Sequence, residues 1–385
     1  MNDKQALHDF PTEITDRVNT PCYLMSRNVI RRNCEILDDV QKKTGAKILL
    51  ALKAFAMPAV FDIISEYLHG VCASGPIEAQ MGREEFGREV HTYSPAFSDE
   101  QFERTVRYSD HIIFNSISQW QLFKDKIPSD KQVGLRVNPG HSEVEVDLYN
   151  PCIAGSRFGV NPSDLDGLDL TEIDGLHFHA MCEQDADVLV RVLRSFEDRF
   201  GKLIPQMKWI NFGGGHHITR EDYQLDLLIN TINDFKSRYD VDVYLEPGEA
   251  VVLNAGVFVT SVLDTITNGE EIAILDCSAE THMPDVIAMP YRPHLVGAGE
   301  AAEKEHTYKL GGISCLAGDF IDTYSFAKPL TRGDKLVFTD MALYSFVKNT
   351  TFNGVELPDL AVFDSSGSVE VVRSFGYSDY RGRLA

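Results

Sequence analysis

The stretch Lys47-Ile48-Leu49-Leu50-Ala51-Leu52-Lys53 gives the strongest signal in the sequence, because a short apolar run ends directly at a lysine. Such a run is typical of a strand that faces a core on both sides, where an ammonium group is costly to bury. Glu246 has the same setting, directly after the run Val241–Leu245. We therefore expect a lysine and a carboxylate, almost 200 residues apart, at the ends of two buried strands.

Six further apolar runs resemble these two, and amphipathic stretches separate most of them. The eight runs are Ala46–Leu52, Gly70–Ala73, Val90–Tyr93, His111–Phe114, Gln132–Val137, Gly175–Phe178, Lys208–Phe212 and Val241–Leu245. The helical stretches are Met57–Leu68, Ile77–Phe86, Glu100–Tyr108, Ser118–Lys126, Ala186–Phe200 and Leu225–Tyr239. This alternation predicts a (β/α)8 barrel. A doubly wound sheet is the alternative, but informative residues follow at least six strands rather than one switch point.

The pattern changes after about Leu253, where helical periodicity fades and short β-rich runs take over. We expect a mostly antiparallel β domain there, over residues 255–385, and the barrel domain over residues 25–254. The long connection Leu135–Gly159 after the fifth predicted strand is expected to be a functional loop.

Composition limits the function further. The 385 residues carry a formal charge of −22, which disfavours nucleic acid and anionic membranes as partners. The first residues contain no apolar segment typical of a signal peptide, and no apolar run approaches a membrane span. Seven cysteines without CxxC spacing predict reduced thiols and a cytoplasmic location.

The residues that follow the predicted strands form a chemically consistent set. Lys53 could act as a nucleophilic amine, and Glu246 could pair with a pyridinium nitrogen. The three glycines Gly213, Gly214 and Gly215 would let backbone N–H groups approach a phosphate. His179 could stack on a cofactor ring. Together they predict a site for pyridoxal phosphate (PLP) at the carboxyl ends of the barrel strands.

Several motifs resemble the fold-type III PLP decarboxylases, which include the ornithine, arginine and diaminopimelate decarboxylases. The resemblance spans the chain in order through Ala51–Ala54, Gly175–His179, Phe212–Gly215, Glu246–Gly248, Gly311–Asp319, Met341–Tyr344 and Phe352–Gly354.

The resemblance implies a role for each matching residue. Lys53 would form the Schiff base with PLP, His179 would stack on its ring, and Glu246 would hold the pyridine nitrogen. The triple glycine and Tyr344 would bind the phosphate. Cys315 would reach across a dimer interface and act near the carbon that is protonated. The resemblance also implies a homodimer with shared active sites and an N-terminal segment, residues 1–24, that belongs to the β domain.

Glu246 indicates the reaction, and the substrate class is what the resemblance implies, with acidic positions that are chemically consistent with it. Glu246 keeps the pyridine nitrogen protonated, which favours decarboxylation over racemisation. Many family members continue Glu-Pro-Gly with arginine, whereas this chain has Glu249, which would attract an ammonium group. Asp285 offers a second acid, and Asp319 is a further candidate for substrate binding. With the stretch His282–Pro293, these features resemble family members that act on a small, cationic, carboxylated polyamine in polyamine biosynthesis.

Three alternatives remain at this stage. One is a diaminopimelate decarboxylase or another basic amino-acid decarboxylase of the same fold. Another is a metal-dependent barrel hydrolase that uses His177, His179, His216 and His217. A non-enzymatic PLP carrier is the third, and the Cys315 and Tyr344 motifs argue against it. We assign no metal ligand from the sequence, and no role to His216 or His217.

Overall fold

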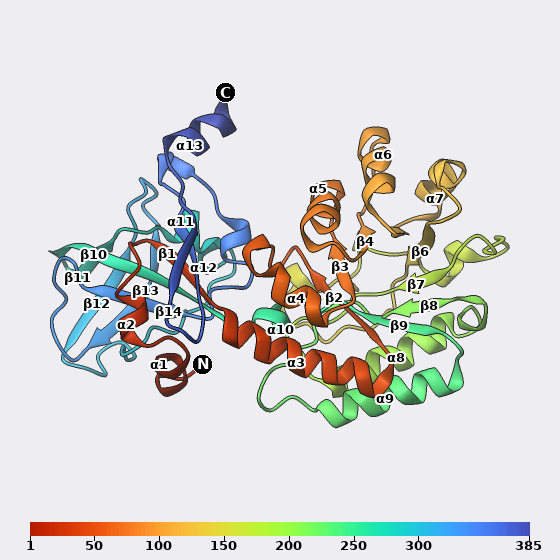
Figure 1. The fold of residues 1–385 in the computed structure, drawn as a ribbon, viewed down its shortest axis with the longest axis horizontal. Helices are drawn as coiled ribbons and strands as arrows, with labels where there is room; N and C mark the ends of the chain where they lie inside the picture. The colour runs from red at the N-terminus through yellow and green to blue at the C-terminus, as the bar shows by residue number, and fades with distance from the viewer. The chain divides into compact units, whose positions relative to one another are not determined.

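The computed structural model describes residues 1–385 and divides into two compact units. The barrel unit is Arg31–Val251, and the β unit combines Met1–Ile30 with Val252–Ala385. We use these limits below in place of the predicted 25–254 and its flanking parts, and we describe each unit by itself (Figure 1).

The barrel unit is built on a closed barrel of eight parallel strands, as predicted. Closure is made by the first and last strands, where Lys47 is level with Tyr244 and Ile48 with Leu245. The strands are β2 (Lys47–Ala51), β3 (Gly70–Ala73), β4 (Glu89–Tyr93), β5 (His111–Phe114), β6 (Gln132–Arg136), β7 (Gly175–His177), β8 (Trp209–Asn211) and β9 (Asp242–Leu245).

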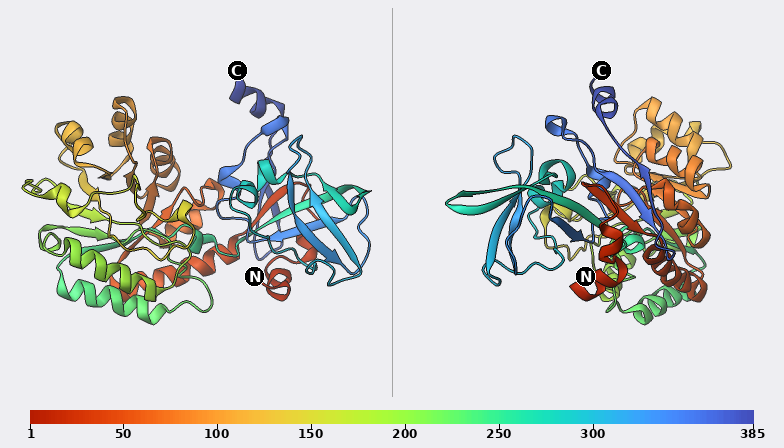
Figure 2. Two further views of the ribbon diagram at one scale, coloured as in Figure 1. Left: turned by 180° about the vertical axis from the view of Figure 1, so that it is seen from behind. Right: turned by 60° about the vertical axis from the view of Figure 1, so that its left-hand side comes forward.

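Helices lie outside the strands in both views of Figure 2. They are α3 (Arg27–Thr44), α4 (Phe61–Tyr67), α5 (Pro76–Met81), α6 (Asp99–Tyr108), α7 (Ile117–Phe123), α8 (Ala186–Phe200), α9 (Leu225–Arg238) and α10 (Glu249–Val252). The stretch predicted as one helix over 77–86 is α5 followed by a π-helical turn, Gly82–Phe86. Gly82 lies there against β3, where an added Cβ would come within 2.5 Å of the Val71 side chain. The helix thus changes to a π turn at the residue, Gly82, that packs closely against Val71 of β3.

Side chains fill the barrel interior. Trp209 packs with Leu49, Ile113 and Tyr244 in one buried cluster. Glycines of β6 and β7 lie against the indole. An added Cβ would come within 2.1 Å of the Trp209 ring at Gly175 and within 2.4 Å of it at Gly134. The barrel is therefore a packed core and not a pore.

The β unit contains a mostly antiparallel sheet with the order β13-β12-β11-β10-β1-β15-β16, and β14 pairs with β10. Its strands are β1 (Cys22–Ser26), β10 (Gly256–Asn268), β11 (Glu270–Leu275), β12 (His306–Gly311), β13 (Phe320–Phe326), β14 (Lys335–Thr339), β15 (Asp359–Phe363) and β16 (Val369–Arg373). The N-terminal strand β1 lies between β10 and β15, antiparallel to one and parallel to the other.

Short helices accompany this sheet: α1 (Asp3–Asp9), α2 (Thr12–Thr15), α11 (Ala279–His282), α12 (Pro284–Ala288) and α13 (Tyr377–Leu384). Phe10 and Ile14 pack with Cys22 and Leu24 in a common core, together with Val257. The structure contains no helix whose length and apolarity would let it span a bilayer.

Candidate active site

Lys53 lies two residues beyond the end of β2, in a turn closed by a hydrogen bond from the Ala54 N–H to the Ala51 carbonyl. Its neighbours Leu52 and Ala54 are buried, but the Lys53 side chain is exposed rather than partly buried as we expected. The apolar run therefore ends where the lysine begins, and its amine points out of the core at the carboxyl end of the barrel.

Glu246 follows β9 at the same end and is held by two side chains. Its Oε1 accepts a hydrogen bond from Asn211 Nδ2 at 2.7 Å, and its Oε2 lies 3.2 Å from His177 Nε2. Burial by itself would raise the pKa of Glu246, but His177 and Asn211 more than offset it and lower the pKa to about 2. Burial also lowers the pKa of His177, so this ring is neutral and donates its Nε2–H. Glu246 is therefore a fixed, ionised carboxylate.

Lys53 and Glu246 act on a common neighbour, Cys72 in β3. Burial is the main reason that the pKa of the Cys72 thiol is well above its usual value, and the charge of Glu246 raises it further while that of Lys53 lowers it. The charges of both residues therefore reach Cys72, and their place in one cofactor site stays a prediction.

The triple glycine forms a tight loop between the ends of β7 and β9. Gly213 and Gly215 have φ angles of +70° and +83°, which favour glycine. An added Cβ would come within 2.3 Å of the Phe178 carbonyl at Gly213, and within 2.4 Å of the Glu246 carbonyl at Gly214. Only glycine fits this loop.

The loop also presents donors. The N–H of Gly213 binds Asn211 Oδ1 at 2.9 Å, and that of Gly214 binds His179 Nδ1 at 2.8 Å. The N–H groups of Gly215 and His216 make no hydrogen bond within the chain. A phosphate fits this cradle, because two adjacent N–H groups and a backbone without side chains meet an anion at close range.

His179 accepts from Gly214, so the proton of its neutral ring is on Nε2. Burial lowers the pKa of His179 well below its usual value, and the charge of Lys53 lowers it further. The ring is therefore uncharged and suited to stacking on an aromatic cofactor.

Arg136 at the end of β6 is a cation that sequence reasoning left without a role. Its guanidinium lies 4.6 Å from the Tyr93 ring centre and 4.5 Å from that of Phe158, and it donates to the His179 carbonyl at 3.3 Å. Phe158 belongs to the long predicted connection. Arg136 therefore fixes both the His179 backbone and one end of this loop.

Glu249 begins α10, and its side chain is only 12 % exposed, with Oε2 4.0 Å from His217 Nε2. The pKa of Cys182 is raised to about 12, chiefly by burial and then by the charges of Glu249 and Glu183. Glu183 is a residue that sequence reasoning missed, because it lies in a loop beyond β7 and not at a strand end. Its φ of +52° is uncommon for glutamate. Two carboxylates thus flank Cys182 on the barrel unit.

The remaining predicted residues lie in the β unit. Asp285 forms an ion pair with Lys348. The carboxylate that we expected to bind an ammonium group of the substrate is therefore already paired with a lysine. Asp319 is buried, and its oxygens accept from the backbone N–H groups of Ala279, Glu280 and Ser314 at 2.8, 3.3 and 3.1 Å. Asp319 therefore ties two loops together, and its predicted contact with substrate stays a prediction.

Cys315 is exposed, and its N–H donates to Asn353 Oδ1 at 2.6 Å. This hydrogen bond joins two of the motifs that resemble the decarboxylase family, one around Cys315 and the other around Asn353. Tyr344 and Asn353 have positive φ angles, +51° and +57°, in the segment that connects β14 and β15.

The four histidines of the rival metal interpretation do not converge. His177 binds Glu246, and His179 binds Gly214. The one group of three or more side chains whose ligand atoms are close enough to hold a metal ion lies elsewhere, in β4 and β5. His216 is buried, which lowers its pKa to about 4.

The fold and the site together define a two-domain barrel enzyme with an amine, a fixed carboxylate and an anion cradle at one end of its strands. The chain belongs to the pyridoxal-dependent decarboxylases, since the family model "Pyridoxal-dependent decarboxylase, C-terminal sheet domain" matches residues 22–342. The members of this family are carboxy-lyases, and the predicted family is confirmed.

Two relatives and one solved structure are similar over nearly the whole chain. The chain is 46 % identical to carboxynorspermidine/carboxyspermidine decarboxylase of Campylobacter jejuni, over 95 % of this chain and 98 % of that protein. It is 40 % identical to carboxyaminopropylagmatine decarboxylase of a Synechocystis species, over 95 % of each. The crystal structure of carboxynorspermidine decarboxylase with norspermidine, from Campylobacter jejuni, superposes with a TM-score of 0.89 at 44 % identity, over 95 % of this chain and all of that chain. Diaminopimelate decarboxylases are more distant, such as that of Thermoplasma acidophilum at 23 % identity.

Proposed function

We propose that the protein decarboxylates carboxynorspermidine and carboxyspermidine to norspermidine and spermidine, with PLP as its cofactor. The observation that supports the substrate is that two carboxylates on the barrel unit, Glu249 and Glu183, both act through their charges on Cys182. The names of the 46 % identical relative and of the similar structure support the same substrate class.

The residues of the barrel end fit PLP. Lys53 would hold it covalently through its amine, the N–H groups of Gly215 and His216 would bind its phosphate, and His179 would lie against its ring. When bound, PLP supplies the electron sink for the electrons left behind as carbon dioxide departs.

Glu246 controls one proton of this chemistry. Because His177 and Asn211 keep it ionised, it would hold a proton on the pyridine nitrogen of bound PLP. A carboxylate that is both buried and oriented needs no rearrangement to do this.

Glu249 and Glu183 would bind the ammonium tail of the substrate. Their charge also disfavours a substrate with a distal carboxylate, because two carboxylates at one site repel each other. This repulsion distinguishes the proposal from the nearest alternative, a diaminopimelate decarboxylase.

The resemblance assigns the remaining roles to the β unit. We propose a homodimer in which Cys315 delivers the proton that replaces carbon dioxide in the active site of the other subunit, and in which Tyr344 binds phosphate. Asp285 and Asp319 stay weaker candidates for substrate binding, because Lys348 and backbone N–H groups already engage them. The seven cysteines are free thiols, which agrees with the predicted cytoplasmic location.

Carbon dioxide release by the PLP-loaded enzyme tests the function. The substrates are carboxynorspermidine, carboxyspermidine, carboxyaminopropylagmatine, diaminopimelate and ornithine. We expect kcat/KM on the first two to exceed that on diaminopimelate by roughly a hundredfold, about 3 kcal/mol of discrimination. Activity confined to diaminopimelate or ornithine would overturn the proposal. Preference for carboxyaminopropylagmatine would reassign the substrate to that of the 40 % identical relative.

A further inference from the structure

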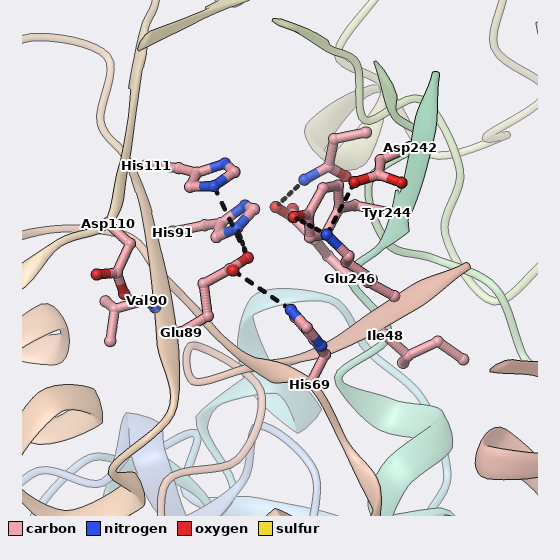
Figure 3. Close-up of polar contacts among 12 residues, drawn as sticks. Ile48, His69, Glu89, Val90, His91, Asp110, His111, Asp242, Tyr244 and Glu246 are labelled. Atoms are coloured by element: carbon pink, nitrogen blue, oxygen red, sulfur yellow. Dashed lines mark hydrogen bonds and ion pairs between the residues drawn. The ribbon is translucent and has the colours of Figure 1, made fainter. Parts of the chain in front are cut away.

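Figure 3 shows a second cluster of titratable side chains near the beginnings of barrel strands. Because the strands are parallel and Lys53 follows the end of β2, this is the opposite end of the barrel from Lys53. Glu89 and His111 are the first residues of β4 and β5, and His91 is two residues further along β4. His69 directly precedes β3. None of these residues contacts Lys53 or the triple glycine in the site described above, although the charge of His91 helps to lower the pKa of Glu246.

The ligand atoms of Glu89, His91 and His111 all lie within 4.8 Å of one another. Glu89 Oε1 is 2.6 Å from His91 Nε2 and 3.8 Å from His111 Nε2. The two imidazoles are stacked, with ring centres 3.8 Å apart. Both rings thus present the same nitrogen to one carboxylate oxygen.

Hydrogen bonding within the chain accounts for Glu89 and His91 but not for His111. Glu89 Oε1 is within hydrogen-bond distance of His91 Nε2, whereas His111 Nε2 is too far from the same oxygen for a hydrogen bond. Both rings are almost completely buried. A buried imidazole that is directed at a carboxylate without reaching it is costly, and an ion between them would satisfy it.

We propose that Glu89, His91 and His111 bind a divalent transition metal of the zinc class. Imidazole nitrogen and carboxylate oxygen are ligands that zinc prefers, whereas magnesium and calcium prefer oxygen alone. Ligand atoms about 2.0–2.2 Å from one tetrahedral ion are about 3.4 Å apart. The ion therefore requires the 2.6 Å contact to open and the 3.8 Å contact to close by less than 1 Å each. It also requires the two rings, which are stacked with an angle of 18° between their planes, to rotate until both Nε2 lone pairs point to the ion.

His69 completes the site as a positioning residue. Its Nε2 lies 3.3 Å from the second oxygen of Glu89, so it can orient the carboxylate toward the two histidines. The side chains of Glu89 and His69 are 23 % and 37 % exposed, which gives an ion a route in from this end of the barrel. The site would link β4 to β5 where the two strands begin, and it revises our expectation that the chain has no metal ligand.

The test is metal analysis of protein purified without a histidine tag, equilibrated with zinc sulfate and then desalted. We expect one zinc per chain in the native protein and background zinc in Glu89→Gln and His111→Phe. His141→Gln is the matched control, because His141 pairs with Glu143 at 3.0 Å without a second histidine in the group, and its loss should not change the stoichiometry. Native protein without zinc, or variants that retain it, would overturn the proposal.

A second measurement needs no variant, in case a substitution in this core prevents folding. Crystals of the native protein soaked in zinc should show an anomalous peak between Glu89, His91 and His111, and zinc should raise Tm by a few degrees. An anomalous map with no peak at these three residues contradicts the site. Because neither measurement involves PLP or the reaction, its outcome is independent of the proposed function.

Discussion

Asn211 Nδ2 lies 2.7 Å from Glu246 Oε1, while the Oδ1 of the same amide accepts the N–H of Gly213. One side chain at the end of β8 therefore orients both the carboxylate proposed for the pyridine nitrogen and the loop proposed for the phosphate. An amide is required, because the residue donates on one side and accepts on the other.

Replacing Asn211 with Asp should move the pH dependence of the reaction. The new carboxylate would still accept from Gly213, but its negative charge beside Glu246 would raise the pKa of Glu246 from about 2. Since the reaction needs Glu246 ionised, the acid limb of the pH profile of kcat/KM should shift upward by roughly one to two units. An acid limb at the same pH as in the native enzyme, with PLP still bound, would contradict this role.

Replacing Lys53 with Ala should abolish covalent attachment of PLP. We expect the visible absorbance of the protein-bound cofactor to disappear, and kcat to fall by roughly 10⁴-fold or more. In the native enzyme, borohydride reduction followed by peptide mass analysis should label Lys53. A label on another lysine, or an unchanged spectrum in Lys53→Ala, would show that the amine is elsewhere.

Glu249→Gln and Glu183→Gln should each raise KM for carboxynorspermidine roughly five- to tenfold and change kcat little. The reason is that a carboxylate which binds a remote ammonium group acts on ground state and transition state alike. Glu103→Gln, an exposed acid on the outer helix α6, is the control. If neither variant changes KM, the idea of ammonium recognition by these two carboxylates is wrong.

The β unit should lose stability in mild acid through His282. This ring is buried, its Nδ1 accepts the Ser278 N–H and its Nε2 lies 3.0 Å from the Glu356 carbonyl. Burial lowers its pKa from 6.5 to about 4, so the unfolded chain takes up the proton first. The contribution is complete above pH 6.5 and is lost as the pH falls toward 4, by about 2 kcal/mol at pH 5.

Urea unfolding at pH 7 and pH 5 measures this loss. His282→Gln should show a smaller difference between the two pH values than the native protein does, whatever its absolute stability. His306→Gln, at a partly exposed position, should keep the native difference. An equal difference in all three proteins would assign the acid sensitivity to other groups.

The barrel could be predicted from the sequence because its strands are buried on both faces. Each one is a short, largely apolar run between amphipathic stretches, so the eight predicted strands match the observed ones to within two residues at each end. Helix α8 was predicted with its observed limits, because its apolar residues follow a single regular stripe. The stretch 57–68 was less regular, and it begins with a 3-10 turn before α4.

The partners of the site residues could not be predicted in the same way. Which atoms hold Glu246 depends on the order β7-β8-β9 in the barrel, and no local pattern marks Asn211 as the donor. The same is true of Asp285 and Asp319, whose charges looked available in the sequence. Lys348 is 63 residues from Asp285 along the chain, so only the folded structure shows that the two form an ion pair.

The indole of Trp209 packs against Gly134 and Gly175 and fills the barrel interior. Packed side chains therefore separate the first residues of β4 and β5 from the carboxyl ends of the strands. An ion bound by Glu89, His91 and His111 would act on Glu246 only through the charge of His91, and not by passing along the barrel axis. Gly175→Ala would displace the indole, because the added Cβ would come within 2.1 Å of it, and would loosen the packing that separates the two ends of the barrel.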